Sequence, residues 1–296
     1  MTAKTNKLTM RGRRELTGWL FVSPMLLVFL TFVVYPILQA FKSSLYGFDY
    51  TSYYWNGFGN YAAILSDSVF LRAVRTTLWF VVLIVPTQTL IALAVSLTIN
   101  RFSNRAQSFY KAVFYVPAVT SVVSLAMVWE YIYNNQFGFA NYALKSVGLA
   151  PVNWLGIDFG VYALALIVVT ISVGAAIVVL SAGLNGIPRE IYESASIDGA
   201  SPGRTLWRIT LPLLKPSLLY VLVTSTIASF QIFTIILLMT GGGPAYKTTT
   251  MLMLIYREAF INMNFGAANA MGIILCLIIT SIALLQFRLM KTDIEY

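Results

Sequence analysis

The chain has 296 residues, of which 58% are hydrophobic and 10% are charged. Soluble domains usually carry charge on about a quarter of their residues, so this composition argues against a water-soluble fold. The net charge of +9 could indicate a nucleic-acid partner, but the placement of the basic residues, described below, argues against one. The sequence has no histidine, which removes the commonest metal ligand. We expect no metal site and no cofactor bound by this chain.

Six apolar segments are long enough to cross the hydrocarbon core of a bilayer, which takes roughly 20 residues of helix. Helices are expected because a spanning chain in lipid must satisfy its own backbone hydrogen bonds. The predicted fold class is therefore an all-α integral membrane protein. The spans are predicted at residues 17–41, 76–99, 112–133, 161–184, 217–240 and 266–287.

The predicted spans form one domain. The basic residues 1–16 resemble the start of a signal peptide, but the apolar run that follows is too long and no small-x-small cleavage site closes it. We therefore expect a cytoplasmic N-terminus, a single transmembrane domain over 17–289 and a short tail over 290–296. The one cysteine, Cys276, lies in the last span, where we expect a small buried residue.

Lysine and arginine are divided unevenly between the two sides of the predicted spans. Segments 1–16, 101–111, 185–216 and 288–296 carry 14 of the 20 basic residues, and the segments on the other side carry six. Cytoplasmic loops are enriched in these residues. Both termini, and the loop 185–216, are therefore predicted in the cytoplasm. Topology explains the basic excess, and a nucleic-acid site is not expected.

The cytoplasmic loop between the fourth and fifth spans has a recognisable helical pattern. Ile187, Ile191 and Ala195 are spaced by four residues and share a helical face, and Gly199 follows where a left-handed turn costs glycine little. Ser201, followed by proline, is typical of the N-cap of a second helix. The pattern predicts two short helices around a glycine. On pattern alone, an interfacial amphipathic hairpin without a partner explains it equally well.

The same loop contains a Glu-Ser-Ala triplet, a glycine four residues later and an Ile-x-Leu-Pro segment that begins ten residues after the glycine. The residues are Glu193, Ser194, Ala195, Gly199, Ile209, Leu211 and Pro212. This pattern resembles the EAA motif of the permease subunits of binding-protein-dependent ABC importers, with serine in place of the second motif residue, alanine. The resemblance implies that the loop is a coupling helix, which in that family docks into a groove on the ATPase subunit.

The resemblance covers nearly the whole chain. The Thr-Gly-Gly-Gly-Pro stretch at 240–244, the Ile-Tyr-Arg stretch at 255–257 and Tyr35-Pro36 are similar to the carbohydrate-uptake branch, in particular to six-helix relatives of the maltose-type first permease. The large outer domain of the maltose subunit is missing. The resemblance implies a type I ABC importer in a bacterial inner membrane. Its partners would be a homologous second permease, two ATPase subunits and an extracytoplasmic substrate-binding protein.

Two rival functions call for features that the sequence does not show. A membrane-embedded enzyme needs convergent acids, bases or nucleophiles, and the predicted spans hold one carboxylate, Glu130, near an end. An ion-coupled carrier usually buries ionisable residues or uses broken helices near the midplane, and we expect neither. The stretch 241–248 is not a P-loop, because Tyr246 stands where glycine must precede the lysine. ATP and Mg²⁺ would therefore bind to a partner ATPase, and we expect no catalytic residue here.

The fifth predicted span offers groups that suit a sugar, namely amides and hydroxyls for its hydroxyl groups and aromatic rings for its C–H surfaces. Helix–helix packing also explains the serines and threonines, and polarity alone favours packing. The family resemblance implies substrate contacts at Phe230, Gln231 and Phe233, with Ser229 or Thr226 adjoining. Gln231 would lie roughly 21 Å along its helix, a little beyond the bilayer midplane. The predicted substrate is a sugar or oligosaccharide, with glycerol phosphate or another polar solute as the alternative.

Overall fold

The computed structural model of the chain describes residues 10–48 and 51–290 and confirms a helical membrane fold. Within those residues, five helical stretches are long and apolar enough to cross a membrane, and a bent pair of helices gives a sixth if it counts as one span. The stretches are Thr17–Ser44, Ser68–Ile99, Gly160–Asn185, Pro202–Met239 and Phe265–Leu289, and the bent pair is Asn104–Val119 with Val122–Ile132.

Short π-helical turns, labelled η, lie within or beside several of the helices. In chain order the elements are α1 (Met10–Phe29), η1 (Leu30–Val34), α2 (Tyr35–Ser44), β1 (Tyr46–Phe48), β2 (Tyr53–Trp55), α3 (Gly59–Ser66), α4 (Ser68–Ile99), α5 (Asn104–Val119), α6 (Val122–Ile132), α7 (Phe139–Ser146), α8 (Gly160–Asn185), α9 (Arg189–Ile197), α10 (Pro202–Thr205), η2 (Leu206–Thr210), α11 (Leu211–Phe230), α12 (Thr234–Met239), α13 (Met251–Tyr256), η3 (Arg257–Ile261) and α14 (Phe265–Leu289).

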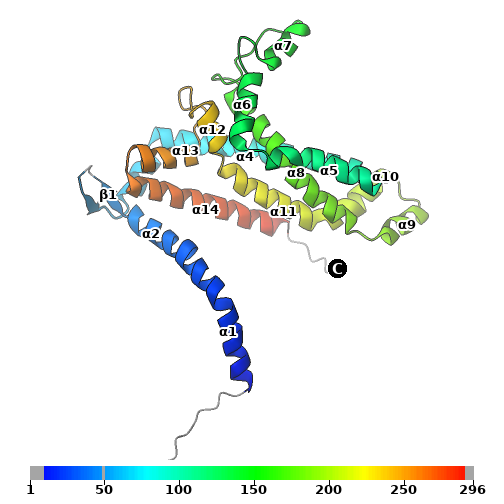
Figure 1. The fold of residues 1–296 in the computed structure, drawn as a ribbon, viewed down its shortest axis with the longest axis horizontal. Helices are drawn as coiled ribbons and strands as arrows, with labels where there is room; N and C mark the ends of the chain where they lie inside the picture. The colour runs from blue at the N-terminus through cyan, green and yellow to red at the C-terminus, as the bar shows by residue number, and fades with distance from the viewer. Residues whose placement is uncertain (1–9, 49–50, 291–296) are drawn as a thin grey trace, which may run out of the picture.

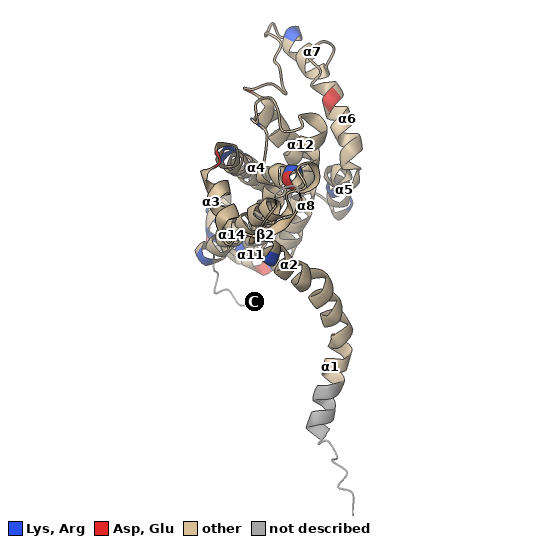
Figure 2. Cartoon of the chain, turned by 90° about the vertical axis from the view of Figure 1, so that its left-hand side faces the viewer, with Lys and Arg blue, Asp and Glu red and all other residues tan. Residues whose placement is uncertain are grey.

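The first span projects away from the other helices (Figure 1). It begins with α1 at Met10, seven residues before the predicted start, and α2 at its far end packs against α14. None of the apolar window within Thr17–Ser44 is buried, and the drawn part of this helix is almost free of charged residues (Figure 2). Phe21 and Met25 are 82% and 77% exposed. An apolar surface of this length must be covered by lipid or by another membrane-embedded chain.

The core lies between α4 and α8, which share the largest interface between elements. α11 packs along both helices, and α14 covers α11 on the other side. Three clusters of buried apolar side chains fill these interfaces, around Phe80, Ile177 and Phe70 respectively. α5 reaches α8 closely because residue 174 is glycine: a Cβ there would collide with the main-chain carbonyl of Phe114.

The third predicted span is not a continuous helix, so the expectation of a single helix over 112–133 is wrong. α5 and α6 are separate helices that meet at an angle of 93°, and α6 rises out of the bundle toward α7 (Figure 1). Pro117 has no N–H for the helix ladder, and the hydroxyl of Thr120 donates to the main-chain carbonyl of Val116 at 2.8 Å. Local competition for backbone partners of this kind ends helices.

Two smaller expectations also need correction. Cys276 is exposed on α14 rather than buried, because it lies on a face of the helix that the bundle does not cover. The predicted loop 42–75 contains a two-stranded antiparallel hairpin, β1 with β2, in which Tyr46 pairs with Trp55. Their rings meet edge to face at 5.3 Å, so aromatic packing stabilises the hairpin across the strands.

The loops gather at the two ends of the bundle in the groups that the charge distribution indicates. At one end, the guanidinium of Arg72 donates to the main-chain carbonyl of Ala245 at 3.1 Å, and Asp158 borders the same cavity. At the other end, Arg101 and Arg189 border one cavity. The assignment of the second end to the cytoplasm stays a prediction from the positive-inside rule.

Candidate functional site

The loop predicted to be cytoplasmic forms the two short helices that its pattern predicts, and a glycine turn separates them. α9 ends in a Schellman motif: the N–H of Ala200 bonds the carbonyl of Ala195 at 2.9 Å, and the N–H of Gly199 bonds that of Ser196 at 3.1 Å. Gly199 has φ +71°, in the left-handed region. No described atom outside its own turn lies within 4 Å of where its Cβ would stand, so the requirement for glycine is conformational and not steric.

The second helix of the loop begins as predicted and runs on into the membrane. The hydroxyl of Ser201 accepts a hydrogen bond from the N–H of Arg204 at 3.4 Å, and Pro202 occupies the first helical turn. α10, η2 and α11 follow without a break. The hydroxyls of Tyr192 on α9 and Thr210 on η2 lie 3.3 Å apart. This hydrogen bond connects α9 to the turn that leads directly into α11.

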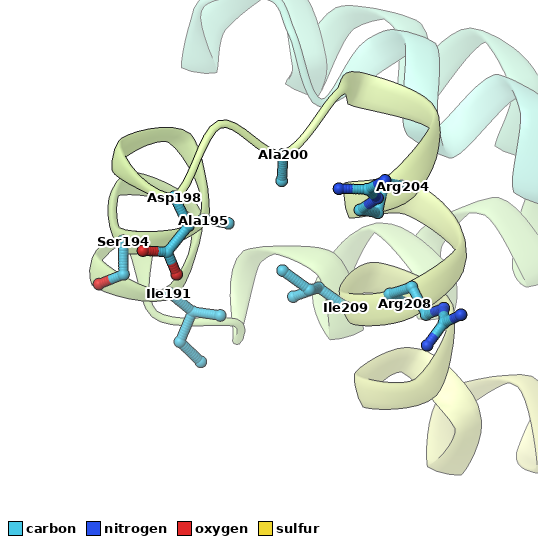
Figure 3. Close-up of a pocket in the computed structure, with 8 residues that line it drawn as sticks. All are labelled: Ile191, Ser194, Ala195, Asp198, Ala200, Arg204, Arg208 and Ile209. Carbon is cyan, nitrogen blue, oxygen red and sulfur yellow. The ribbon is translucent and has the colours of Figure 1, made fainter.

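A cavity of about 730 Å³ lies between the two helices (Figure 3). Ile191 and Ala195 on α9 and Ile209 on η2 form its apolar lining. Asp198 lies at the α9 side and Arg204 extends toward it from α10 (Figure 3). A concave surface with an apolar floor and charges of both signs at its rim suits a protein partner better than a small polar ligand.

The motif residues divide between the two faces of this loop. Ala195 is buried at 7% exposure, whereas Glu193 and Ser194 are exposed on α9. The hydroxyl of Ser194 donates to the main-chain carbonyl of Glu190 at 2.8 Å and is already partnered within its own helix. Ile209 and Leu211 are half-buried and Pro212 is exposed.

Two apolar side chains of this loop are far more exposed than the pattern indicates. Ile197 at the end of α9 is 86% exposed, and Trp207 on η2 is 72% exposed. The helical spacing of Ile187, Ile191 and Ala195 accounts for the inward face only, so neither residue was picked out from the sequence. Large exposed apolar side chains on a loop outside the membrane core mark a contact surface. An apolar residue out of phase with the buried stripe is the sequence signal that could have identified them.

The fifth span is interrupted, which corrects the predictions of a continuous helix over 217–240 and of no broken helix near the midplane. α11 ends at Phe230 and α12 begins at Thr234. Gln231 has left the helical conformation, with φ −99° and ψ 15°. The hydroxyl of Thr250 donates to the main-chain carbonyl of Ile232 at 3.1 Å. Non-helical backbone at this depth is tolerated where protein groups satisfy it or where it lines a cavity.

The predicted path residues differ in burial: Thr226, Ser229 and Phe230 are buried on α11, whereas Gln231, just after its end, is exposed. Phe230 is 1% exposed and packs in the cluster around Phe70. The hydroxyl of Thr226 is buried and accepts a hydrogen bond from Nε2 of Gln286 at 2.8 Å, as a packing residue does. The ring of Phe233 lies 4.9 Å from that of Tyr256.

Gln231 is the predicted path residue that the structure leaves exposed. On α11 it continues a line of exposed residues, Tyr220, Thr224 and Ala228, which recur at spacings of three and four and therefore share a helical face. We call these four residues the α11 stripe. The hydroxyl of Thr224 donates to the main-chain carbonyl of Tyr220 at 2.7 Å. The amide of Gln231 has no such partner among the described residues, and within a membrane span an unpaired amide must face a hydrated space or another chain.

Tyr220, Thr224 and Ala228 of the α11 stripe border a cavity of about 310 Å³ between α4, α8 and α11, to which Ser229 also contributes. Gln231 lies beyond the end of α11 and is not part of this lining. Gln88 of α4 lies in this cavity, and its Oε1 accepts a hydrogen bond from the hydroxyl of Ser172 on α8 at 2.9 Å. The described residues that line the cavity include hydroxyl and amide groups but none that is charged. The site therefore offers neutral hydrogen-bonding groups on an apolar wall, without a fixed charge.

The chain is similar to known transport proteins along almost its whole length. Residues 56–291 match the family described as "Binding-protein-dependent transport system inner membrane component". An sn-glycerol-3-phosphate transport system permease protein of Agrobacterium fabrum is 31% identical over 288 residues, which cover 95% of this chain and 97% of the relative. A trehalose/maltose transport system permease protein of Thermococcus litoralis is 31% identical over 290 residues, with coverages of 96% and 97%.

A solved structure shares the fold. It is the crystal structure of a bacterial ABC transporter involved in the import of the acidic polysaccharide alginate, and it matches with a TM-score of 0.82 at 22% identity. The match covers 96% of this chain and 98% of that chain. At this identity the likeness concerns the arrangement of the helices.

Proposed function

This chain belongs to the family of binding-protein-dependent transport system inner membrane components, and we propose that it forms the translocation path of an ATP-driven importer for a neutral sugar or oligosaccharide. The observation that carries the substrate class is the cavity beside the α11 stripe. Amide and hydroxyl groups there match sugar hydroxyls, and the ring of Tyr220 can pack on a sugar C–H face.

The alternative substrate, glycerol phosphate, fits this cavity less well. A phosphate ester carries one to two negative charges, and burying them without a cationic partner is costly. The described lining of the cavity has no lysine or arginine. Relatives of both kinds resemble the chain equally, at 31% identity, and the uncharged lining supports our choice of a neutral substrate.

The cytoplasmic loop is proposed to couple this path to a separate ATPase subunit that binds ATP and Mg²⁺. Exposed Glu193, Ile197 and Trp207 offer one charge and two apolar side chains to such a partner. When the ATPase closes on ATP, the loop moves with it, and the Tyr192–Thr210 hydrogen bond passes the displacement to α11. The bundle then switches the side to which its cavity opens, a two-state movement biased by the contacts in each state.

The remaining partners follow from the uncovered surfaces and from the family description. A homologous second permease is proposed to cover part of the first span, whose apolar side chains meet no other part of the described bundle along most of their length. An extracytoplasmic substrate-binding protein is implied by the dependence that the family description states. Both termini are proposed to lie in the cytoplasm.

Uptake by a strain that lacks this gene, with and without the gene restored, tests the proposal. We expect the restored strain to regain ATP-dependent uptake of a neutral di- or oligosaccharide. Restoration of glycerol 3-phosphate uptake alone would show that the substrate is glycerol phosphate and not a neutral sugar. Uptake that stops with a protonophore but survives ATP depletion would identify an ion-coupled carrier instead.

A further inference from the structure

A second cavity, of about 500 Å³, lies at the end of the bundle predicted to face outward. It joins the start of α4, the segment that leads into α8 and the turn after α12. Three of its lining residues are cationic and one is acidic, so its formal net charge is +2. The residues that line it are Arg72, Arg75, Thr76, Trp79, Leu83, Ile157, Asp158, Val161, Tyr162 and Lys247.

Topology does not account for the cations of this cavity. The positive-inside rule explains why lysine and arginine gather at the cytoplasmic end, where Arg101, Lys111 and Arg189 border another cavity. The outward segments hold six of the 20 basic residues, and three of those six line this one cavity. A concentration of cations on the side that is otherwise depleted in them calls for a local cause.

One of the three cations is held in place, and none of them forms an ion pair within the described residues. Arg72 is fixed by its hydrogen bond to the carbonyl of Ala245, and the hydroxyl of Thr76 donates to the main-chain carbonyl of Lys247 at 3.4 Å. Over residues 10–48 and 51–290, neither the guanidinium of Arg75 nor the ammonium of Lys247 makes a side-chain hydrogen bond or an ion pair. Three cations share this cavity with one carboxylate, that of Asp158, so two positive charges remain uncompensated and an anion would stabilise the site.

The rest of the lining is amphipathic. The indole of Trp79 and the phenol of Tyr162 are 48% and 56% exposed. Leu83 lies one turn further along α4 from Trp79, and Val161 precedes Tyr162 at the start of α8. Tryptophan and tyrosine occupy the level of the lipid headgroups in membrane proteins. A cationic rim above aromatic and aliphatic side chains matches a phosphate group that is attached to an apolar chain.

We propose that this cavity binds a phosphate monoanion, of the kind that the headgroup of an anionic phospholipid presents, at the outer membrane–water interface. Arg72, Arg75 and Lys247 contact the phosphate oxygens, and Trp79 packs against the glycerol and upper acyl region. The site is separate from the uncharged cavity beside the α11 stripe, so its ligand is not the transported sugar. Basic pockets between membrane helices bind lipid headgroups through the same chemistry.

The site is tested by measuring which lipids stay bound to the protein. The 296-residue chain is purified in detergent together with the subunits that co-purify with it. Native mass spectrometry compares dioleoylphosphatidylglycerol with dioleoylphosphatidylcholine. We expect a clear preference for phosphatidylglycerol in the wild type, and about fivefold weaker binding for each cation removed in Arg75→Gln and Lys247→Gln. Arg75→Lys should bind more tightly than Arg75→Gln because it keeps the charge. Lys145→Gln removes an exposed cation of an outward segment that does not line the cavity, and should change nothing.

A second arm distinguishes the source of the phosphate. Inorganic phosphate and glycerol 3-phosphate are titrated against the same proteins at constant ionic strength. Binding of these soluble anions that depends on Arg75, without a preference for phosphatidylglycerol, would support an anion site filled from solution. The proposal is overturned if phosphatidylglycerol binds no better than phosphatidylcholine and the soluble anions do not bind, or if the Gln variants bind as the wild type does. Because the readout is binding, it does not depend on the transported substrate.

Discussion

The hydroxyl of Thr250 donates a 3.1 Å hydrogen bond to the main-chain carbonyl of Ile232, inside the interruption between α11 and α12. Thr250 also caps the start of α13, accepting from the N–H of Met253 at 3.4 Å. Its neighbours Thr248 and Thr249 donate to the carbonyls of Gly243 and Gly242. A run of three buried threonines thus connects the glycine-rich turn to the broken helix, at the point where Gln231 is exposed.

Thr250→Val is expected to destabilise the interruption, because it leaves the buried carbonyl of Ile232 without a donor while nearly preserving volume. The cost should be about 1–2 kcal/mol. The measurement is the thermal unfolding temperature of the purified chain, with uptake assayed in parallel. Thr250→Ser keeps the hydroxyl and should lie close to wild type. Thr234→Val changes an exposed threonine nearby, and an equal loss in that variant would show that the Thr250 hydrogen bond has no special role.

Gly199→Ala is expected to weaken coupling through backbone strain. With φ at +71°, any side chain costs about 1 kcal/mol or more in the left-handed region, and the turn should shift to relieve it. Gly203→Ala is the matched control, because Gly203 lies in a helix with no described neighbour within 4 Å of its Cβ position. Co-purification of the ATPase and ATP-dependent uptake should fall in the first variant and not in the second. Equal behaviour of the two would mean that the turn does not position α9.

Ile197→Ser and Trp207→Ser test the proposed contact surface for the ATPase. Both side chains are exposed in the isolated chain, so their loss should leave its thermal stability nearly unchanged. If they are buried on the partner, each truncation should weaken ATPase association by about tenfold or more, the range found for apolar anchors of protein interfaces. Ile261→Ser removes another exposed isoleucine, at the opposite end of the bundle, and serves as the control. Unchanged association in both loop variants would place the ATPase contact elsewhere.

The features that local sequence determines were predictable, and those that depend on distant partners were not. Gly199 and Ser201 were assigned correctly because a helix end and a helix start are decided by a few neighbouring residues. The interruption at Gln231 was not predicted. The donor that satisfies the main-chain carbonyl of Ile232 there is the hydroxyl of Thr250, 18 positions further along the chain. Helical spacing therefore placed residues from both sides of the break on one face, because the spacing contains no sign of the break.

The burial of Phe230 has the same origin. An aromatic residue in an apolar span looks the same in sequence whether it faces a cavity or a core. Its position in the core depends on α3, α13 and α14, which supply Ile64, Met251 and Met271 to the same cluster. Sequence alone could therefore name the helix that lines the path, but not which of its faces is open.

Single-cysteine labelling tests the predicted topology, and the structure selects the positions. Lys145→Cys and Ser201→Cys both replace exposed side chains. Asn141 is less suitable, because its side chain is 2% exposed and accepts hydrogen bonds from the N–H of Val152 and the indole N–H of Trp154. The background must be Cys276→Ala, since Cys276 is exposed. A membrane-impermeant maleimide added to intact spheroplasts should label position 145 and not 201. Labelling of both from one side would contradict the assignment of the two ends.

Gln231→Leu tests the substrate path most directly. The substitution nearly preserves volume and deletes the amide of the one predicted path residue that is exposed at the helix interruption. If that amide bonds a sugar hydroxyl, its loss should cost about 1–1.5 kcal/mol, which is five- to tenfold in uptake efficiency. Expression and assembly should be unaffected, because the side chain makes no hydrogen bond within the described residues. Gln231→Leu should reduce the uptake of a sugar that lacks the contacted hydroxyl less than the uptake of the native sugar, because that sugar cannot form the hydrogen bond in the first place.

Thr226→Val provides the contrast. The hydroxyl of Thr226 accepts a hydrogen bond from Gln286 in the interior, so its loss should lower thermal stability more than uptake per folded complex. If Gln231→Leu instead impairs assembly and leaves uptake per assembled complex unchanged, the exposed amide contacts a neighbouring subunit and not the sugar.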